Sequence, residues 1–175
     1  ITSPGLGDYL IVPKYYHNYV SPALNDNYTA RTSVIKWISE PYYGPFYVAA
    51  NGSDSNNGDE DHPFASIEAA LKAVNLTNAV PAIFIKEGNY KESNLNITKA
   101  VNITGIGEVI IDAQGNNGIF NISANYVNIT NLEFANGNSS TDGGAIYWSG
   151  SYGKLENSTF INNTAADRGG SIYNS

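Results

Sequence analysis

The sequence repeats itself at an interval of about 26 residues in its C-terminal half. When it is aligned with itself at this offset, glycine, aliphatic and aromatic positions fall on positions of the same kind. These coincidences include Gly118, Gly144 and Gly170, then Ile103, Ile129 and Leu155, and finally Phe134 and Phe160. The offset holds without an insertion from residue 101 to residue 174, which makes almost three units. Repeats of this length are typical of solenoids, in which each unit stacks on the one before it.

Each unit reads as three short strands separated by turns. Stretches such as VNITGI, GIFNIS and KLENSTFIN are rich in β-branched and aromatic residues, are broken by Gly or Asn, and lack a helical period. Three strands and three turns make one coil of a parallel β-helix, with successive coils about 4.8 Å apart. An antiparallel sandwich, the alternative, would leave the constant offset unexplained. We therefore expect a mainly β fold, a right-handed parallel β-helix (β-solenoid) of about 26 residues per coil, since parallel crossovers are nearly always right-handed.

The stacking gives particular turn residues a structural role. Asn131 and Asn157 lie at an expected tight turn, where Asn tolerates the left-handed conformation and its amide can bond to the amide one coil away. Gly118, Gly144 and Gly170 mark a second corner, where a β-carbon would crowd the chain. We expect these five residues to shape the coil.

Residues 1–46 differ from the rest of the chain. They hold seven of the thirteen tyrosines and five of the seven prolines, and they lack the repeat. We expect an extension that packs on the solenoid or on a neighbour, followed by a β-helix over 47–175. The apolar spacing predicts a capping helix at about 66–74, with Ser66 as its N-cap. Because the chain stops within a coil, we expect further coils or another molecule to cover that uncapped C-terminal end.

Asparagine is the most over-represented residue. The sequence has 24 Asn, 16 Ser and 10 Thr, so chance predicts roughly four Asn-x-Ser/Thr triplets, yet ten occur. This excess indicates an extracellular, glycosylated protein at the cell surface, although strand alternation alone also produces motifs such as NIT. The candidate glycosylation sites are Asn27, Asn51, Asn75, Asn96, Asn102, Asn121, Asn128, Asn138, Asn157 and Asn162.

Three stretches resemble known families. YVAANGSDSNNGDEDHPFASIEAAL (47–71) resembles the entry segment of the pectate-lyase-like right-handed β-helix superfamily. FINN (160–163) followed by GGSI (169–172) resembles the FxxN and GGA[ILV] repeat of chlamydial polymorphic outer-membrane proteins, with Ser171 in place of Ala. With the Asn-rich coils and the absence of cysteine, the chain is most similar to adhesin-like surface proteins of methanogenic archaea. The resemblance implies a β-helix over 47–175, but it does not choose between lyases, hydrolases, adhesins and structural proteins.

The repeat also tests for catalytic acids. A β-helix hydrolase needs two neighbouring carboxylates, and a lyase needs a calcium site and a base. At the same offset Glu108 falls on Phe134 and Asp142 falls on Arg168, and no two carboxylates share a column. The second pair predicts an ion pair at a solvated corner, which Asp167 can extend. We therefore expect no catalytic residue, no metal ligand and no enzymatic activity in this chain.

Other features restrict the possible partners. The net charge of −7 disfavours nucleic acid, and no apolar run is long enough to span a membrane. The acidic loop 51–61 could hold calcium, but a solvated turn explains it better, and no other cofactor is indicated. Tyr147 and Tyr173 share a column, and they point outward if Ile146 and Trp148 point inward. Such an exposed aromatic strip could hold sugar rings.

Three functions remain open. The first is adhesion or cell-envelope structure by a secreted surface solenoid, with envelope components or cell-surface or host carbohydrate as partners. The second is a self-assembling filament or sheath subunit that stacks on copies of itself through the uncapped coil. The third is a fragment of a polysaccharide-active enzyme. Further coils with an anchor would favour the first, polymerisation of the 175-residue chain the second, and acid-dependent polysaccharide cleavage the third.

Overall fold

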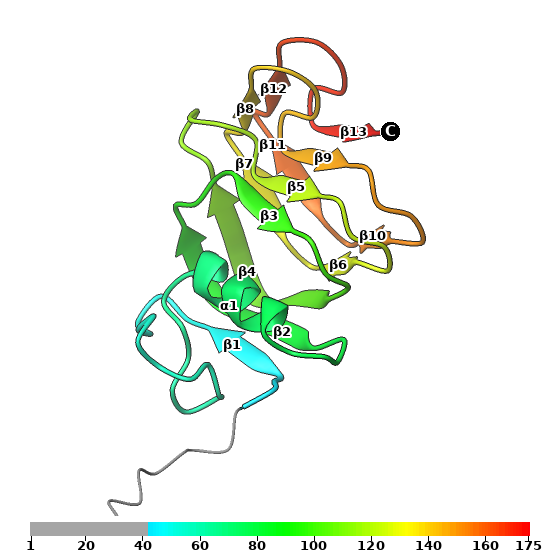
Figure 1. The fold of residues 1–175 in the computed structure, drawn as a ribbon. Helices are drawn as coiled ribbons and strands as arrows, with labels where there is room; N and C mark the ends of the chain where they lie inside the picture. Colours follow the sequence, from blue (N-terminus) through cyan, green and yellow to red (C-terminus); the bar gives the residue numbers. More distant parts are fainter. Residues whose placement is uncertain (1–41) are drawn as a thin grey trace, which may run out of the picture. The chain divides into compact units, whose positions relative to one another are not determined.

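The computed structural model describes residues 42–175, which form a mainly β unit with one short helix (Figure 1). Every strand pairing in this unit is parallel. Parallel sheets built from short, sequentially distant strands are compatible with a β-solenoid. Residues 1–41 of the predicted extension (1–46), including the sequon at Asn27, lie outside the described residues.

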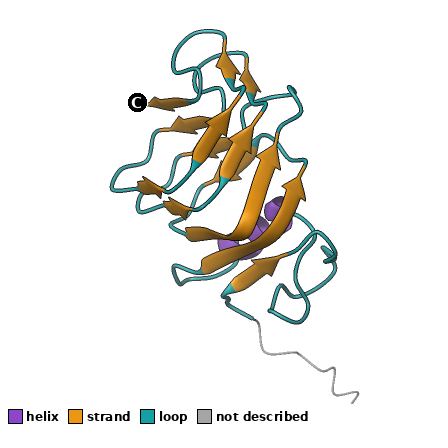
Figure 2. Ribbon diagram, turned by 180° about the vertical axis from the view of Figure 1, so that it is seen from behind, coloured by secondary structure: helices purple, strands orange, loops and turns teal. Residues whose placement is uncertain are grey.

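The largest sheet forms one side of the unit (Figure 2). Its strands are β1 (Phe46–Val48), β2 (Ala82–Tyr90), β4 (Asn102–Asp112), β6 (Asn128–Thr130), β7 (Glu133–Ala135), β10 (Lys154–Glu156) and β11 (Thr159–Ile161). The long strands β2 and β4 each cover the stretch that later in the chain is divided into two short strands. Accordingly β4 pairs with both β6 and β7.

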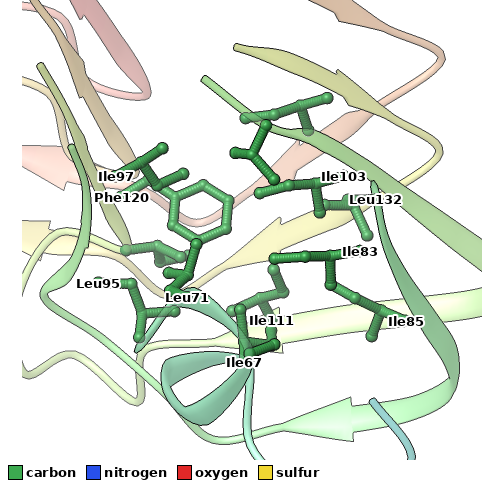
Figure 3. Packing of buried hydrophobic residues seen from close by; sticks show 14 of the residues in the cluster. Ile67, Leu71, Ile83, Ile85, Leu95, Ile97, Ile103, Ile111, Phe120 and Leu132 are labelled. Carbon is green, nitrogen blue, oxygen red and sulfur yellow. The ribbon is translucent and has the colours of Figure 1, made fainter. Parts of the chain in front are cut away.

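Two smaller sheets complete the arrangement. A four-stranded sheet has the order β13-β9-β5-β3, and a two-stranded sheet joins β12 to β8. Their strands are β3 (Leu95–Ile97), β5 (Phe120–Ile122), β8 (Asn138–Ser139), β9 (Ile146–Trp148), β12 (Thr164–Ala165) and β13 (Ile172–Asn174). Apolar side chains from the four-stranded sheet and the large sheet face each other and form the core between them (Figure 3).

The predicted repeat offset is confirmed in most of the strand register. Ile103 pairs with Ile129, and Ile129 pairs with Leu155, so the three residues form the expected column. Phe134 pairs with Phe160, and their rings stack with centroids 5.0 Å apart. Ile103, Ile129 and Phe134 are fully buried. Burying one such side chain contributes about 1.5–3 kcal/mol, so the columns are a principal source of stability.

One part of the predicted register is wrong. Phe134 pairs with Ile111 and not with Glu108, so the offset is shorter here by three positions. The extra positions lie in β4 between Thr104 and Asp112, where the backbone passes Gly107 at a φ of 79°. The following loop is shorter by the same amount, which restores the expected register by Phe120. The two changes compensate, and the sequence comparison therefore missed them.

Helix α1 (Ile67–Asn75) packs on the core beside the first strands (Figure 1). Its N-cap is Ser66, whose hydroxyl accepts a hydrogen bond from Ala69 N at 3.1 Å. Glu92 adds a second cap, since its carboxylate accepts from Ile67 N at 2.7 Å and Glu68 N at 2.9 Å. The apolar face consists of Ile67, Ala70, Leu71 and Val74. The sequence pattern thus corresponds to a helix that covers one end of the apolar interior.

No helix in the described part of the chain combines the length and the apolar character needed to cross a bilayer.

Candidate functional site

An open pocket of about 310 Å³ lies on the outer face of the four-stranded sheet. Its lining includes Asn94, Asn121 and Tyr147 from the sheet side and Ser140, Thr141 and Asp142 from the loop after β8. We call it the outer pocket. It is built from the sheet, the loop and the charges between them.

Strand alternation supplies the sheet side of the outer pocket. In β5 and β9 the residues Phe120 and Ile146 are buried, so their neighbours Asn121 and Tyr147 face outward and pair with each other. Asn121 donates from Nδ2 to Asn96 Oδ1 at 3.1 Å. This hydrogen bond and the strand pairing place an amide and an aromatic ring side by side on the sheet.

The predicted outward column of tyrosines is present. The rings of Tyr147 and Tyr173 lie 5.6 Å apart, with 31° between their planes. Trp148, the neighbour of Tyr147, is buried, as the alternation predicted. Tyr147 therefore offers a half-buried aromatic surface to the outer pocket.

The loop between β8 and β9 forms the opposite wall. Ser139 Oγ donates to Asp142 O at 2.9 Å, and Thr141 N donates to Ser139 Oγ at 3.2 Å. The loop then turns at Gly143, whose φ of 67° is left-handed. Ser140 and Thr141 remain exposed, and their hydroxyls are available to a ligand. The sequence pattern predicted a corner at Gly144, but it did not predict that the residue with the left-handed φ is its neighbour Gly143.

The structure brings together Asp142 and Arg168, which the repeat placed in one column. The carboxylate accepts from Arg168 N at 3.0 Å, from Nε at 3.1 Å and from Nη2 at 2.8 Å. The hydrogen bond to Asp142 raises the pKa of Arg168 above its ordinary value. Asp167 lies 3.7 Å from Arg168 Nε, and the guanidinium also lies 4.4 Å from the Tyr173 ring centroid. Arg168 lies one repeat later in the chain, and we call the strands of one repeat a strand level. The charge of Asp142 is thus balanced by an arginine of the next strand level.

The chemistry of the outer pocket is that of an uncharged polar site. Among its lining residues Asp142 is the only one with a carboxylate, and this carboxylate forms an ion pair with Arg168. The remaining polar groups are amides, hydroxyls and backbone atoms, beside the ring of Tyr147. Such groups can hydrogen-bond a polyhydroxylated ligand, and the ring can contact its C–H surface. A pair of neighbouring carboxylates, which glycoside hydrolysis requires, is not among the lining residues.

The turn residues form two kinds of structure. Asn131 and Asn157 adopt φ values of 59° and 45°, and Asn157 donates from Nδ2 to Asn131 Oδ1 at 3.1 Å. At the glycine corner a β-carbon on Gly144 would lie 1.8 Å from Gly170 O, whereas one on Gly118 would lie 3.2 Å from Gly143 O. A β-carbon on Gly170 would have 3.8 Å to its nearest neighbour, Asn163 O. Close approach therefore requires glycine at position 144 most strictly.

The candidate glycosylation sites are spread over several surfaces. Asn102 and Asn128 are half-buried, whereas the other described sites are exposed. These exposed sites are Asn51, Asn75, Asn96, Asn121, Asn138, Asn157 and Asn162. Asn121 also lines the outer pocket, which its sequon gave no reason to expect.

The acidic loop 51–61 binds its own backbone. Asp54 Oδ1 accepts from Ala65 N and Ser66 N, both at 2.9 Å, and Asp59 Oδ1 accepts from His62 N at 2.7 Å. Between residues 42 and 175 no three His, Cys, Asp or Glu side chains are grouped closely enough to hold a metal ion. The described loop is thus a set of carboxylate-capped turns.

Sequence reasoning missed most of the outer pocket. Asn94, Ser140 and Thr141 belong to no repeated motif, and only the folded chain brings them beside Tyr147. It also missed Asn163, whose amide donates to Phe134 O at 2.9 Å and accepts from Gly137 N at 2.8 Å. The only available signal for Asn163 was its place within the FINN motif.

Comparison with known proteins shows similarity to a family model over a short segment. The model of the Chlamydia polymorphic membrane protein (Chlamydia_PMP) repeat matches residues 157–175. This segment contains both FINN and GGSI, and it includes Arg168 and Tyr173, which contact the pocket residues Asp142 and Tyr147. No curated protein and no solved structure shows significant similarity to the chain. The chain therefore carries a segment similar to one repeat of this kind.

Proposed function

We propose that this chain is part of an extracellular, cell-surface adhesin that binds uncharged carbohydrate through the outer pocket. The observation that carries the proposal is the half-buried, outward-facing Tyr147 ring, flanked by amides and hydroxyls, in an open pocket whose one carboxylate is paired with arginine. Carbohydrates present both hydroxyls and apolar C–H faces, and this combination of groups suits them. Acidic glycans would instead need unpaired cationic groups.

We infer that the underlying architecture is a right-handed parallel β-helix with about 26 residues per coil. The parallel register at this offset over β6, β9, β10 and β13 supports the coil length. The strong preference of parallel crossovers for one hand supports the handedness. The entry segment at 47–71 further supports a relation to the pectate-lyase-like superfamily, and the Asn-rich coils support one to archaeal adhesin-like proteins.

The surface location rests on two independent features. The segment at 157–175 is similar to a repeat of a polymorphic membrane protein, and the sequence contains ten sequons. Both features favour a chain exposed outside the cell. We further propose that the chain does not act as an enzyme, since the outer pocket contains one carboxylate where hydrolysis needs two.

Binding of the 175-residue chain to immobilised neutral, uronic and sulfated oligosaccharides tests the proposal. We expect binding to neutral oligosaccharides, with little dependence on salt because no net charge is engaged. Tyr147→Ala should weaken binding about tenfold, which corresponds to about 1.4 kcal/mol. The matched control is Tyr126→Asn, which removes an exposed tyrosine outside the outer pocket, at a left-handed residue that Asn tolerates.

Two results would contradict the proposal. One is the absence of binding to every glycan tested while the chain is folded. The other is a preference for acidic glycans that disappears as salt is raised, which would place the binding groups on a cationic surface elsewhere.

A further inference from the structure

We propose that Asn51 and Asn162 are the two N-glycan acceptors of the folded unit, and that the remaining described sequons are protected by the fold. The inference concerns the acceptor chemistry of the folded chain; its biological use rests on the proposed extracellular location. In the transfer, Asn Nδ2 attacks the anomeric carbon of a lipid-pyrophosphate-linked oligosaccharide. A C–N bond forms, the bond from carbon to the pyrophosphate oxygen breaks, Nδ2 loses one proton, and the lipid pyrophosphate leaves. The acceptor therefore needs an accessible Nδ2 atom and a reachable hydroxyl two residues later.

Five sequons have their Nδ2 atom committed to a hydrogen bond. Three of these bonds join neighbouring strand levels through amide pairs, and the other two reach a backbone carbonyl. The donors and acceptors are Asn121 to Asn96 Oδ1 (3.1 Å), Asn128 to Asn102 Oδ1 (2.8 Å), Asn157 to Asn131 Oδ1 (3.1 Å), Asn138 to Gly115 O (3.1 Å) and Asn96 to Asn94 O (3.3 Å). Each bond uses one of the two N–H groups of Nδ2 and fixes the orientation of the amide, which restricts how the amide can be presented to a transferase.

Strand packing adds a steric barrier for the sequons inside strands. Asn128 lies between its paired residues Asn102 and Lys154, and Asn121 lies between Asn96 and Tyr147. Neighbouring strands are only about 4.8 Å apart, so an approaching donor meets a side chain on either side. Asn102 itself is half-buried and is the acceptor in the Asn128 bond.

In the sequon at Asn75, the hydroxyl residue Thr77 is buried, although Asn75 itself is accessible. The Asn75 side chain is exposed at the last residue of α1, but Thr77 is 2% exposed. Thr77 Oγ1 lies 3.3 Å from both Val74 O and Ala79 O, to which its hydroxyl can donate. A transferase that must contact this hydroxyl cannot reach it while the chain is folded.

Asn51 and Asn162 satisfy both conditions. Within residues 42–175 no hydrogen bond involves the Nδ2 atom of Asn51 or of Asn162, and both side chains are exposed. Their hydroxyl residues, Ser53 and Thr164, are exposed as well. Asn51 projects from a tight turn closed by Gly52 N donating to Ala49 O at 2.8 Å.

The position of Asn51 also suits the outer pocket. Asn51 follows β1, which lies at one end of the unit, whereas the strands β5, β8 and β9 lie toward the other end (Figure 1). Residues of these strands and of the loop after β8 line the outer pocket. A glycan on Asn121, by contrast, would fill the pocket that Asn121 lines. Protection of Asn121 therefore keeps the pocket open.

The test presents the folded 175-residue chain to a purified oligosaccharyltransferase and a lipid-pyrophosphate oligosaccharide, followed by peptide mass spectrometry. Synthetic peptides that span each sequon are the matched controls. We expect Asn51 and Asn162 to be modified in both chain and peptide. The other described sequons should be modified in peptides, but at least tenfold less in the folded chain. Asn102→Ala removes the acceptor of the Asn128 bond and should raise modification of Asn128, with folding checked by circular dichroism.

Comparable modification of Asn121 or Asn128 and Asn51 in the folded chain would overturn the inference. So would an unmodified Asn51 or Asn162 whose peptide is a good acceptor. Because this readout involves neither sugar binding nor cellular location, its failure is distinguishable from failure of the proposed adhesin function.

Discussion

Replacing the three repeated glycines by alanine gives a graded test of close packing between strand levels. Gly118, Gly144 and Gly170 occupy the same repeat position, and none has a left-handed φ, so alanine is compatible with each backbone. Only the space for a β-carbon differs, with nearest atoms at 3.2, 1.8 and 3.8 Å respectively. The three variants therefore isolate the steric effect.

The clearances set the expected free energies. Ordinary contact begins at 3.4 Å, whereas the β-carbon of Gly144→Ala would lie 1.8 Å from Gly170 O, so the two levels must move apart by more than an ångström. The nearby bonds from Gly143 N to Arg168 O (2.8 Å) and from Gly144 N to Gly169 O (3.1 Å) cannot survive that movement. Two lost hydrogen bonds at about 1 kcal/mol each and over-packing strain of about 1–3 kcal/mol give a loss of about 3–5 kcal/mol.

The controls should behave differently. Gly118→Ala requires a shift of only a few tenths of an ångström, so we expect a loss of about 1 kcal/mol or less. Gly170→Ala meets no close atom, and the lower entropy of its unfolded chain should make it neutral or stabilising by about 0.4–1 kcal/mol.

Urea unfolding followed by far-ultraviolet circular dichroism measures all three variants. At a slope of about 2 kcal/mol per molar urea, Gly144→Ala should lower the midpoint by about 1.5–2.5 M. If Gly144→Ala and Gly170→Ala unfold at the same urea midpoint, the levels are not packed as described and the reasoning is refuted.

Three further predictions concern the core, the amide ladder and the helix cap. Phe134→Ala should cost about 3–5 kcal/mol and Phe160→Ala less, because Phe134 is fully buried and Phe160 only partly; urea midpoints that match would contradict this. Asn131→Ala should lower the free energy of unfolding by about 2–3 kcal/mol, since it removes the 2.8 Å hydrogen bond to Gly105 O and strains the left-handed backbone. Asn131→Gly also removes the hydrogen bond but relieves the backbone strain, so it should lose less stability. Equal losses for the two variants would show that backbone strain does not contribute. Burial raises the pKa of Glu92 despite the two backbone N–H donors, so the protonated carboxyl stabilises the folded chain. This contribution is complete at pH values below the ordinary pKa near 4.5 and is lost as pH rises through the raised pKa of the folded state. Glu92→Gln should flatten the resulting decline of the urea midpoint with pH, and an unchanged decline would exclude Glu92 as its source.

The sequence predicted those features that repeat. The column of Ile103, Ile129 and Leu155 follows from a constant offset, because parallel strands place equivalent residues beside one another. Helix α1 followed from local spacing and a serine cap. Both depend on periodic or short-range patterns, which a single sequence contains.

Features that do not repeat were missed. The insertion in β4 is compensated within one repeat, so the glycine alignment at Gly118 concealed it. The outer pocket combines Asn94 with Thr141 and Tyr147, which only the three-dimensional arrangement of loop and sheet brings together. Likewise the commitment of each sequon amide depends on its neighbour one level away, as Asn128 and Asn102 illustrate.

Disulfide trapping tests the central structural claim, the parallel register between successive repeats, most directly. The sequence contains no cysteine, so an engineered pair has no competitor. Asn128 and Lys154 are directly paired, at roughly the 4.8 Å between adjacent strands, within the range that a disulfide bridges. We predict rapid oxidation of Asn128→Cys/Lys154→Cys to an intramolecular disulfide and little oxidation of Asn128→Cys/Glu156→Cys, which is displaced by two residues on the same face. Preferential cross-linking of the displaced pair, or equal oxidation of both pairs in the folded chain, would contradict the account.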